Sequence, residues 1–234
     1  MIEFSSYTSE GPRTKNQDAL LITDVAGVGL LVCVADGVGG NQGGEVASQM
    51  AIDVFSNSLI KNRLSLSDSL TKSHEALLSH ASQNPELSGM ATTLTAAIIT
   101  QQGIVGVHCG DSRAYLIRGK GIKQLTTDHS EVAKLLSEGR ITKEDALNYP
   151  RKNVITSALG THKELLINEF QFDVINNDRL LILTDGYYGA VSKKEFRDIS
   201  LQSPNISNLV ENTNKQLEIN TTNDNYTIAA IEVF

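Results

Sequence analysis

Residues 30–37 read Leu-Leu-Val-Cys-Val-Ala-Asp-Gly, an apolar run that ends in an aspartate and a glycine. A β-branched-rich run of this length is typical of a buried strand. Further apolar runs adjoin three other acidic segments, namely Gly110-Asp111-Ser112, Asp185-Gly186 and Asn223-Asp224-Asn225. If these four strand ends share one edge, their hard oxygen atoms would suit Mg²⁺ or Mn²⁺. The sequence therefore predicts a metal site, on the condition that the strand ends converge.

The composition excludes several classes of protein. Hydrophobic residues make up 40% of the 234 residues and charged residues 20%, as in ordinary soluble globular proteins. The net charge of −7 and the absence of a basic stripe argue against nucleic-acid binding. No run approaches the ~18 apolar residues of a membrane span, and the N-terminus lacks a signal-peptide pattern. We therefore expect a cytoplasmic protein without membrane association, in which Cys33 and Cys109 are buried thiols.

The order of the expected elements favours an α+β fold. Helical periodicity predicts helices over residues 45–61 and 67–82, and weaker patterns predict 131–138, 143–148, a capped helix from Ser192, and 207–218. Strands are expected at 2–7, 18–24, 30–35, 91–100, 103–109, 113–118, 167–174, 179–184 and 226–234. Because strands and helices do not alternate regularly, mainly antiparallel sheets covered by helices fit better than a doubly wound parallel sheet. We expect one domain over residues 1–234.

The segment from Asp36 to Glu45 holds five glycines within eight positions. Such a density indicates a backbone with unusual torsion angles or a close approach to another group, although a flexible turn is an equal alternative. A P-loop is excluded because its Gly-Lys-Ser/Thr ending is missing, and a dinucleotide fingerprint is excluded because Gln42 replaces its third glycine. The carboxylate of Asp36 and the carbonyl of Gly37 remain as a pair of oxygen ligands for a hard cation. Arg13, just before a strand, would suit bidentate capture of a phosphoryl group if it lies beside that cation.

Seven segments, in order along the chain, resemble motifs of the PP2C-like metal-dependent serine/threonine protein phosphatases in their compact bacterial form. They are residues 11–18 (GPRTKNQD), 34–48 (VADGVGGNQGGEVAS), 90–94 (MATTL), 109–115 (CGDSRAY), 125–130 (LTTDHS), 183–186 (LTDG) and 224–227 (DNYT). One motif would be weak evidence, but seven collinear motifs are specific. The resemblance implies two mainly antiparallel sheets packed as a central sandwich flanked by helices (four layers, αββα), with a metal site at one end.

The resemblance also implies a role for each matching residue. Asp36 would bridge two Mn²⁺ or Mg²⁺ ions, with the Gly37 carbonyl on the first and with Asp185 and Asp224 on the second. Asp111, together with Asp185, would hold a third, looser ion. Arg13 matches the phosphate-binding arginine, Asp18 would orient metal-bound water, and Asn225 would support the site. The implied reaction is direct attack on phosphorus by a water or hydroxide shared by the two ions.

Three residues depart from the pattern. Gln17 stands where many relatives have glutamate, which removes one negative charge and would weaken metal affinity. Val38 stands where eukaryotic members carry a histidine proposed as general acid, and Ala91 replaces a usual glycine. Residues 128–160 would correspond to a flap beside the site that serves substrate selection, and His129 within it is expected to be structural.

These observations lead to one main hypothesis and several alternatives. The chain is expected to dephosphorylate phosphoserine and phosphothreonine on proteins, including a serine/threonine kinase, as a monomer without nucleic acid or membrane partners. A phosphatase with an aspartyl nucleophile would need a second aspartate at Val38. A catalytically weak pseudophosphatase that binds phosphoproteins remains as the non-enzyme alternative because of Gln17.

Overall fold

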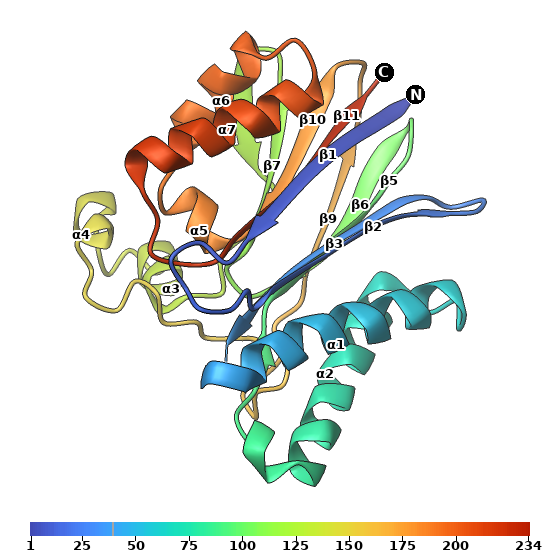
Figure 1. Cartoon of the computed structure of the whole chain (residues 1–234), viewed down its shortest axis with the longest axis vertical. Helices are drawn as coiled ribbons and strands as arrows, with labels where there is room; N and C mark the ends of the chain where they lie inside the picture. Colours follow the sequence, from blue (N-terminus) through green and yellow to red (C-terminus); the bar gives the residue numbers. More distant parts are fainter. Residues whose placement is uncertain (39) are drawn as a thin grey trace.

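The structure is a computed structural model that describes residues 1–38 and 40–234. Two antiparallel sheets lie face to face, and helices cover their outer faces (Figure 1). The first sheet has the order β1 (Ile2–Ser9), β11 (Tyr226–Val233), β10 (Asp178–Leu183), β7 (Arg113–Arg118), β8 (Gly121–Gln124). The second has the order β2 (Asp18–Val25), β3 (Gly29–Val38), β5 (Leu94–Ile99), β6 (Gly103–Cys109), β9 (Asn168–Asp173), with β4 (Ala91–Thr92) paired to β3. The expected α+β sandwich is confirmed.

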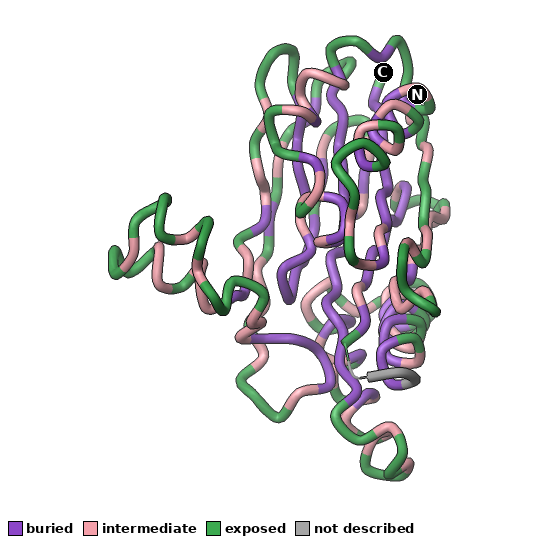
Figure 2. The backbone as a smooth tube through the Cα atoms, turned by 60° about the vertical axis from the view of Figure 1, so that its left-hand side comes forward, coloured by how far each residue is buried: buried purple, intermediate pink, exposed green. Residues whose placement is uncertain are grey.

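Strand β3 is apolar without interruption because both of its faces are buried. Its residues 31, 33 and 35 face helices α1 (Gly40–Ile60) and α2 (Leu66–Gln83), while residues 30, 32 and 34 face the core between the sheets. Successive side chains of a strand point to opposite faces, so a strand buried on both sides cannot alternate with polar residues. In Figure 2 the buried residues run along the strands in the middle of the sandwich. Cys33 and Cys109 are buried free thiols, as expected.

The first sheet is covered in the same way on its outer face. Leu181 and Leu183 of β10 pack against helices α5 (Asp185–Tyr188), α6 (Lys193–Gln202) and α7 (Ile206–Asn220). Helix α6 begins at the predicted capping box, in which Ser192 and Glu195 exchange hydrogen bonds between side chain and backbone. With α1 and α2 on the opposite side, the layers are helix, sheet, sheet, helix.

Several boundaries differ from the predictions. Helix α1 begins at Gly40 and not at Glu45, so the glycine-rich segment mostly forms its first turns; Gly39 lies outside the described residues. Strand β3 continues to Val38, which places Asp36 inside the strand and not after its end. The strand expected over residues 91–100 is split into β4 and β5. The short helices η1 (Pro85–Leu87) and α5 were not predicted.

Residues 128–160 form a segment with two short helices, α3 (Glu131–Ser137) and α4 (Lys143–Leu147), which stands out from the sandwich in Figure 1. We call it the flap segment. Bridges between Ser130 and Ile155 and between Thr92 and Leu159 connect it to itself and to β4. Among the helices of the described residues, none has the length and apolar character that a membrane crossing requires.

The N-terminal and C-terminal strands are neighbours. Strand β1 pairs with β11 over its whole length, from Ile2 opposite Val233 to Ser9 opposite Tyr226. The pairing is extended by hydrogen bonds between Met1 and Phe234, at 2.8 and 3.0 Å. The two termini therefore lie side by side at one end of the sandwich (Figure 1).

Candidate active site

A pocket of about 620 Å³ brings together residues from distant parts of the sequence. Its lining includes Arg13, Asp36, Gly37, Asp111, Asp185 and Asp224. Strand β3 supplies Asp36, and Asp185 follows β10 as the first residue of α5. Asp111 follows β6 and Asp224 precedes β11. The condition set by the sequence is thus met, because the four acidic segments converge on one pocket.

The convergence is visible in the electrostatics of the carboxyl groups. The pKa of Asp36 lies well above its usual range because the group is buried and is acted on by the charges of Asp18, Asp185, Asp111 and Asp224. Burial followed by the Asp185 charge raises the pKa of Asp111 to about 7. Burial and the Asp224 charge raise the pKa of Asp185 to about 6. Each carboxylate therefore destabilises its neighbours, and a bound divalent cation would offset this repulsion.

Asp18 lies beside the pocket but is absent from its lining. It sits directly opposite Asp36 in the β2–β3 register. Its Oδ2 accepts a hydrogen bond of 2.9 Å from Thr184, and its buried Oδ1 has no partner among the described residues. Burial is the largest cause that raises the pKa of Asp18 to about 7. Asp18 therefore lies behind Asp36 and outside the pocket lining, and its role in orienting metal-bound water stays a prediction.

Threonine hydroxyls hold Asp36 in place, a role that the sequence did not predict. The backbone N–H of Asp36 donates to Thr93 Oγ1 at 2.9 Å. The Asp36 carbonyl accepts from the Thr93 N–H and from Thr92 Oγ1, both at 2.9 Å. Thr93 Oγ1 is also 2.8 Å from Ser112 Oγ, in the loop that carries Asp111. The Ala-Thr-Thr motif therefore fixes the position of Asp36 and links it to the Asp111 loop. The motif was the only signal in the sequence for this role.

Arg13 is carried by a loop that Asn225 fastens. The Asn225 side chain accepts from Gln17 N–H at 2.9 Å and donates to the carbonyls of Glu10 and Lys15, each at 2.8 Å. The structure thus gives Asn225 the supporting position that was expected. Arg13 Nη2 lies 2.9 Å from Asp224 Oδ2, and the two side chains are 56% and 45% exposed. The guanidinium is consequently accessible at the mouth of the pocket.

Close packing explains the glycine at position 37. A Cβ atom there would lie 2.1 Å from the carbonyl oxygen of Gly44, in the second turn of α1. A Cβ atom on Gly44 would in turn approach Gln17 within 2.8 Å. Of the two possibilities open in the sequence, close approach is therefore the one found at this pair. The contact sets the start of α1 against the strand that carries Asp36.

The donor set fits a hard divalent cation. Carboxylates and a backbone carbonyl are oxygen ligands of the kind that Mg²⁺ and Mn²⁺ prefer, and neither histidine nor cysteine lines the described pocket. No three His, Cys, Asp or Glu side chains within residues 1–38 and 40–234 form a preassembled metal-binding group. Metal ligation therefore stays a prediction. It is supported by the oxygen donors and by the mutual repulsion of the carboxylates, and it concerns Asp36, Gly37, Asp111, Asp185 and Asp224.

Comparison with known proteins agrees with the fold and the pocket. The family described as protein phosphatase 2C matches residues 10–220. The serine/threonine phosphatase stp of Listeria welshimeri is 36% identical over 178 residues, covering 72% of this chain and 71% of the relative. A solved serine/threonine phosphatase of S. agalactiae has a TM-score of 0.92 at 26% identity, over 100% of both chains. The catalytic domain of the phosphatase PstP, solved with 2 manganese ions, has a TM-score of 0.85 at 29% identity, over 100% of this chain and 99% of that chain.

The sandwich, the acidic pocket and these relatives together define a serine/threonine protein phosphatase of the metal-dependent class. The chain belongs to the protein phosphatase 2C family. The resemblance inferred from the seven motifs is therefore confirmed.

Proposed function

We propose that this chain removes phosphate from phosphoserine and phosphothreonine on proteins, with Mn²⁺ or Mg²⁺ bound by the carboxylates of the pocket. The observation that carries the proposal is the gathering of all five predicted ligands and Arg13 around one pocket in a member of this family. Asp36 would bridge two cations, with Gly37 on the first and with Asp185 and Asp224 on the second. Asp111 with Asp185 would hold a third. When bound, such cations stabilise charge on phosphoryl oxygens and lower the pKa of coordinated water.

The chain's own residues would bind and orient the substrate. The exposed Arg13 guanidinium can donate two parallel hydrogen bonds to phosphoryl oxygens and offset their charge in the transition state. This requires Arg13 to leave Asp224, and an exposed ion pair of this kind costs little to exchange. Asp18, whose carboxyl group is oriented by Thr184, would help to orient water bound to the cations.

The flap segment would select the protein substrate. Its residues Asn153, Ile155 and Thr156 line the same pocket as the carboxylates, and the cationic side chains of Lys15 and Lys163 also line it. Phosphorylated protein segments, including those of a serine/threonine kinase, would lie across this rim. We further propose a single catalytic domain with a flap subdomain, acting as a monomer in the cytoplasm.

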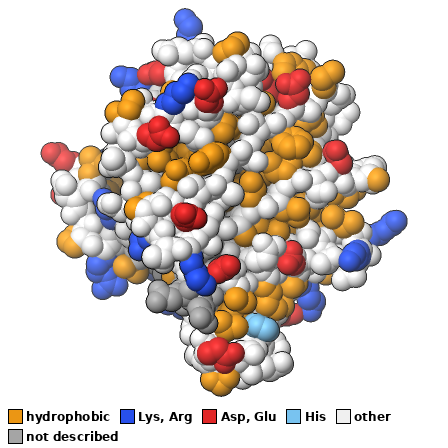
Figure 3. Space-filling view, in the orientation of Figure 1, with side chains coloured by type: hydrophobic (Ala, Val, Ile, Leu, Met, Phe, Trp, Pro, Cys, Tyr) orange, Lys and Arg blue, Asp and Glu red, His pale blue; other side chains and the backbone are white. Residues whose placement is uncertain are grey.

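We propose no nucleic-acid or membrane partner. On the face shown in Figure 3, Lys and Arg side chains are scattered and mixed with Asp and Glu. The net charge of −7 would repel a nucleic-acid backbone.

The proposal is tested by hydrolysis of p-nitrophenyl phosphate and of a phosphothreonine peptide. We expect turnover with Mn²⁺, none with EDTA, and loss of turnover in Asp36→Asn and Asp185→Asn. Full activity in EDTA, or undiminished activity of Asp36→Asn, would contradict it. Peptide binding without turnover in the wild-type chain would favour the pseudophosphatase alternative.

A further inference from the structure

The loop that carries Asp111 is bonded on both sides by the first two residues of the flap segment. Before Asp111, the Gly110 carbonyl accepts a hydrogen bond of 2.6 Å from the His129 N–H. The Gly110 N–H donates to His129 Nδ1 at 3.2 Å. After Asp111, Arg113 is bonded to Asp128 through three contacts of 2.6 to 3.1 Å. Asp128 and His129 thus fasten the flap segment to a loop of the catalytic pocket.

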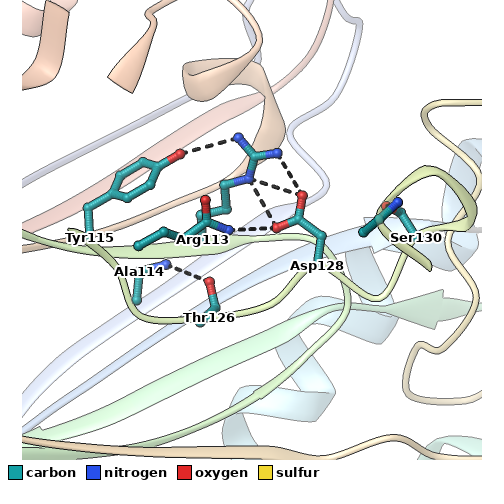
Figure 4. Close-up of polar contacts among 8 residues, drawn as sticks. Arg113, Ala114, Tyr115, Thr126, Asp128 and Ser130 are labelled. Atoms are coloured by element: carbon teal, nitrogen blue, oxygen red, sulfur yellow. Dashed lines mark hydrogen bonds and ion pairs between the residues drawn. The ribbon is translucent and has the colours of Figure 1, made fainter. Parts of the chain in front are cut away.

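Arg113 is the centre of this connection, as Figure 4 shows. Its Nε and Nη2 atoms engage both carboxylate oxygens of Asp128, and its Nη1 donates to the Tyr115 hydroxyl at 3.2 Å. The guanidinium carbon lies 3.7 Å from the centre of the Tyr188 ring, in the helix that begins with Asp185. The side chains of Arg113 and Asp128 are only 27% and 11% exposed. One guanidinium therefore joins three elements: β7, the flap segment and helix α5.

His129, together with Glu131, holds the part of the flap segment that faces the pocket. The His129 carbonyl accepts from the Thr156 N–H at 2.7 Å, and the Glu131 N–H donates to the Val154 carbonyl at 2.9 Å. Asn168 on β9 is 2.7 Å from His129 Nε2 and fixes the ring from the other side. Ile155 and Thr156, which lie between these bonds, line the pocket. A displacement of His129, the residue next to Asp128, would therefore be passed on to these two lining residues.

We propose that Arg113 is a positioning residue that keeps the flap segment in register with the carboxylates, through its contacts with Asp128 and Tyr188. The inference rests on the proposed function. The role needs a planar guanidinium, which donates two hydrogen bonds to the Asp128 carboxylate and stacks on the Tyr188 ring; a lysine ammonium can do neither. Arg113 touches no substrate in this scheme; it acts through Thr156 and Ile155 on one side and through Asp185 and Asp111 on the other.

Strand β7 provides a matched control at its opposite end. Arg118 makes an equivalent two-pronged pair with Asp178, at 2.9 and 2.6 Å, far from the pocket in the fold. Arg118→Lys therefore removes the same kind of fork from the same strand without touching the flap segment. Asp128→Asn serves as a second variant that weakens the Arg113 pair from the other partner.

The first measurement is amide hydrogen exchange, which does not depend on activity. In Arg113→Lys we expect exchange at His129, Glu131 and Thr156 to accelerate about tenfold, the effect of losing one charged hydrogen bond. Exchange in β11 should stay unchanged, and Arg118→Lys should leave the three flap amides at their wild-type rates. Unchanged flap exchange in both Arg113→Lys and Asp128→Asn would overturn the proposal.

The second measurement compares substrates of two sizes. The kcat/KM for a phosphothreonine peptide should fall about tenfold more than that for p-nitrophenyl phosphate in Arg113→Lys, because the small ester does not extend to the flap segment. An equal fall for both substrates, or the same pattern in Arg118→Lys, would contradict a flap-positioning role. Failure of the proposed function would instead appear as a wild-type chain without Mn²⁺-dependent turnover, while the exchange result would still stand.

Discussion

His108 should make the unfolding free energy of this protein fall at acidic pH, and a substitution of His108 should remove this dependence. The side chain is fully buried in β6, with Nδ1 at 2.8 Å from Thr95 Oγ1. Its Nε2 atom has no partner among the described residues, and the His129 ring lies 5.0 Å away. Burial, followed by the His129 charge, lowers the pKa of His108 to about 3.

The direction of the pH dependence follows from the linkage between proton binding and folding. Between the folded pKa of about 3 and the unfolded value of 6.5, only the unfolded chain binds the His108 proton. The contribution of this group is therefore present above pH 6.5 and is lost as the pH falls. From pH 7 to pH 5 the expected loss is about 2 kcal/mol of unfolding free energy.

The assay is urea denaturation followed by circular dichroism at pH 7, 6 and 5, in EDTA so that metal occupancy does not vary. The carboxyl groups with raised pKa act in the opposite direction, but they are common to wild type and variant and cancel in the comparison. His108→Gln should lose about 2 kcal/mol less than wild type over this range, and His108→Leu should behave alike. His162→Gln, at an exposed position just after the flap segment, controls for the loss of one imidazole. Parallel losses in wild type and both His108 variants would refute the reasoning.

Three further substitutions give distinct outcomes. Asp36→Asn should abolish Mn²⁺-dependent turnover. In EDTA the same variant should have an unfolding free energy higher by roughly 1 kcal/mol, because it removes a buried carboxyl group that neighbouring carboxylates repel. A less stable variant would contradict this expectation. Thr93→Val should lower kcat about tenfold without unfolding the chain, since the contacts to Asp36 and Ser112 are lost, and Thr93→Ser should retain most activity. Arg179→Met should cost about 3–5 kcal/mol in urea denaturation, because it leaves Glu232 buried without its 2.9 Å partner; Arg179→Met combined with Glu232→Leu should recover much of that loss.

The strands were predictable because their physical cause is local. The runs at 103–109 and 113–118 carry enough apolar and β-branched residues to fix both ends, and the structure has β6 and β7 at those residues. Ser192 and Glu195 likewise announce a helix start through their own hydrogen bonds. The convergence of the acidic segments was also within reach, because the strands that position them share one end of the sandwich.

The start of α1 could not be predicted from local preference. Glycine is a poor helix former, so the segment after Asp36 looked like a turn. Contacts with distant residues decide otherwise: a Cβ atom on Gly44 would lie only 2.8 Å from Gln17, and one on Gly43 would press on Met90 at 3.1 Å. The hydroxyl contacts of Thr93 and Thr184 were missed for a related reason, because a threonine beside a strand end gives no sign of which group it will meet across the fold.

The pairing of β1 with β11 has a consequence for folding during synthesis on the ribosome. Arg13 meets Asp224, and the loop around it is fastened by Asn225, so the pocket joins residues more than 200 positions apart. During synthesis the N-terminal loop emerges long before these partners exist. A ribosome-bound chain that stops short of Asn223 should therefore be inactive, and phosphatase activity should arise only once β11 has been released to pair with β1.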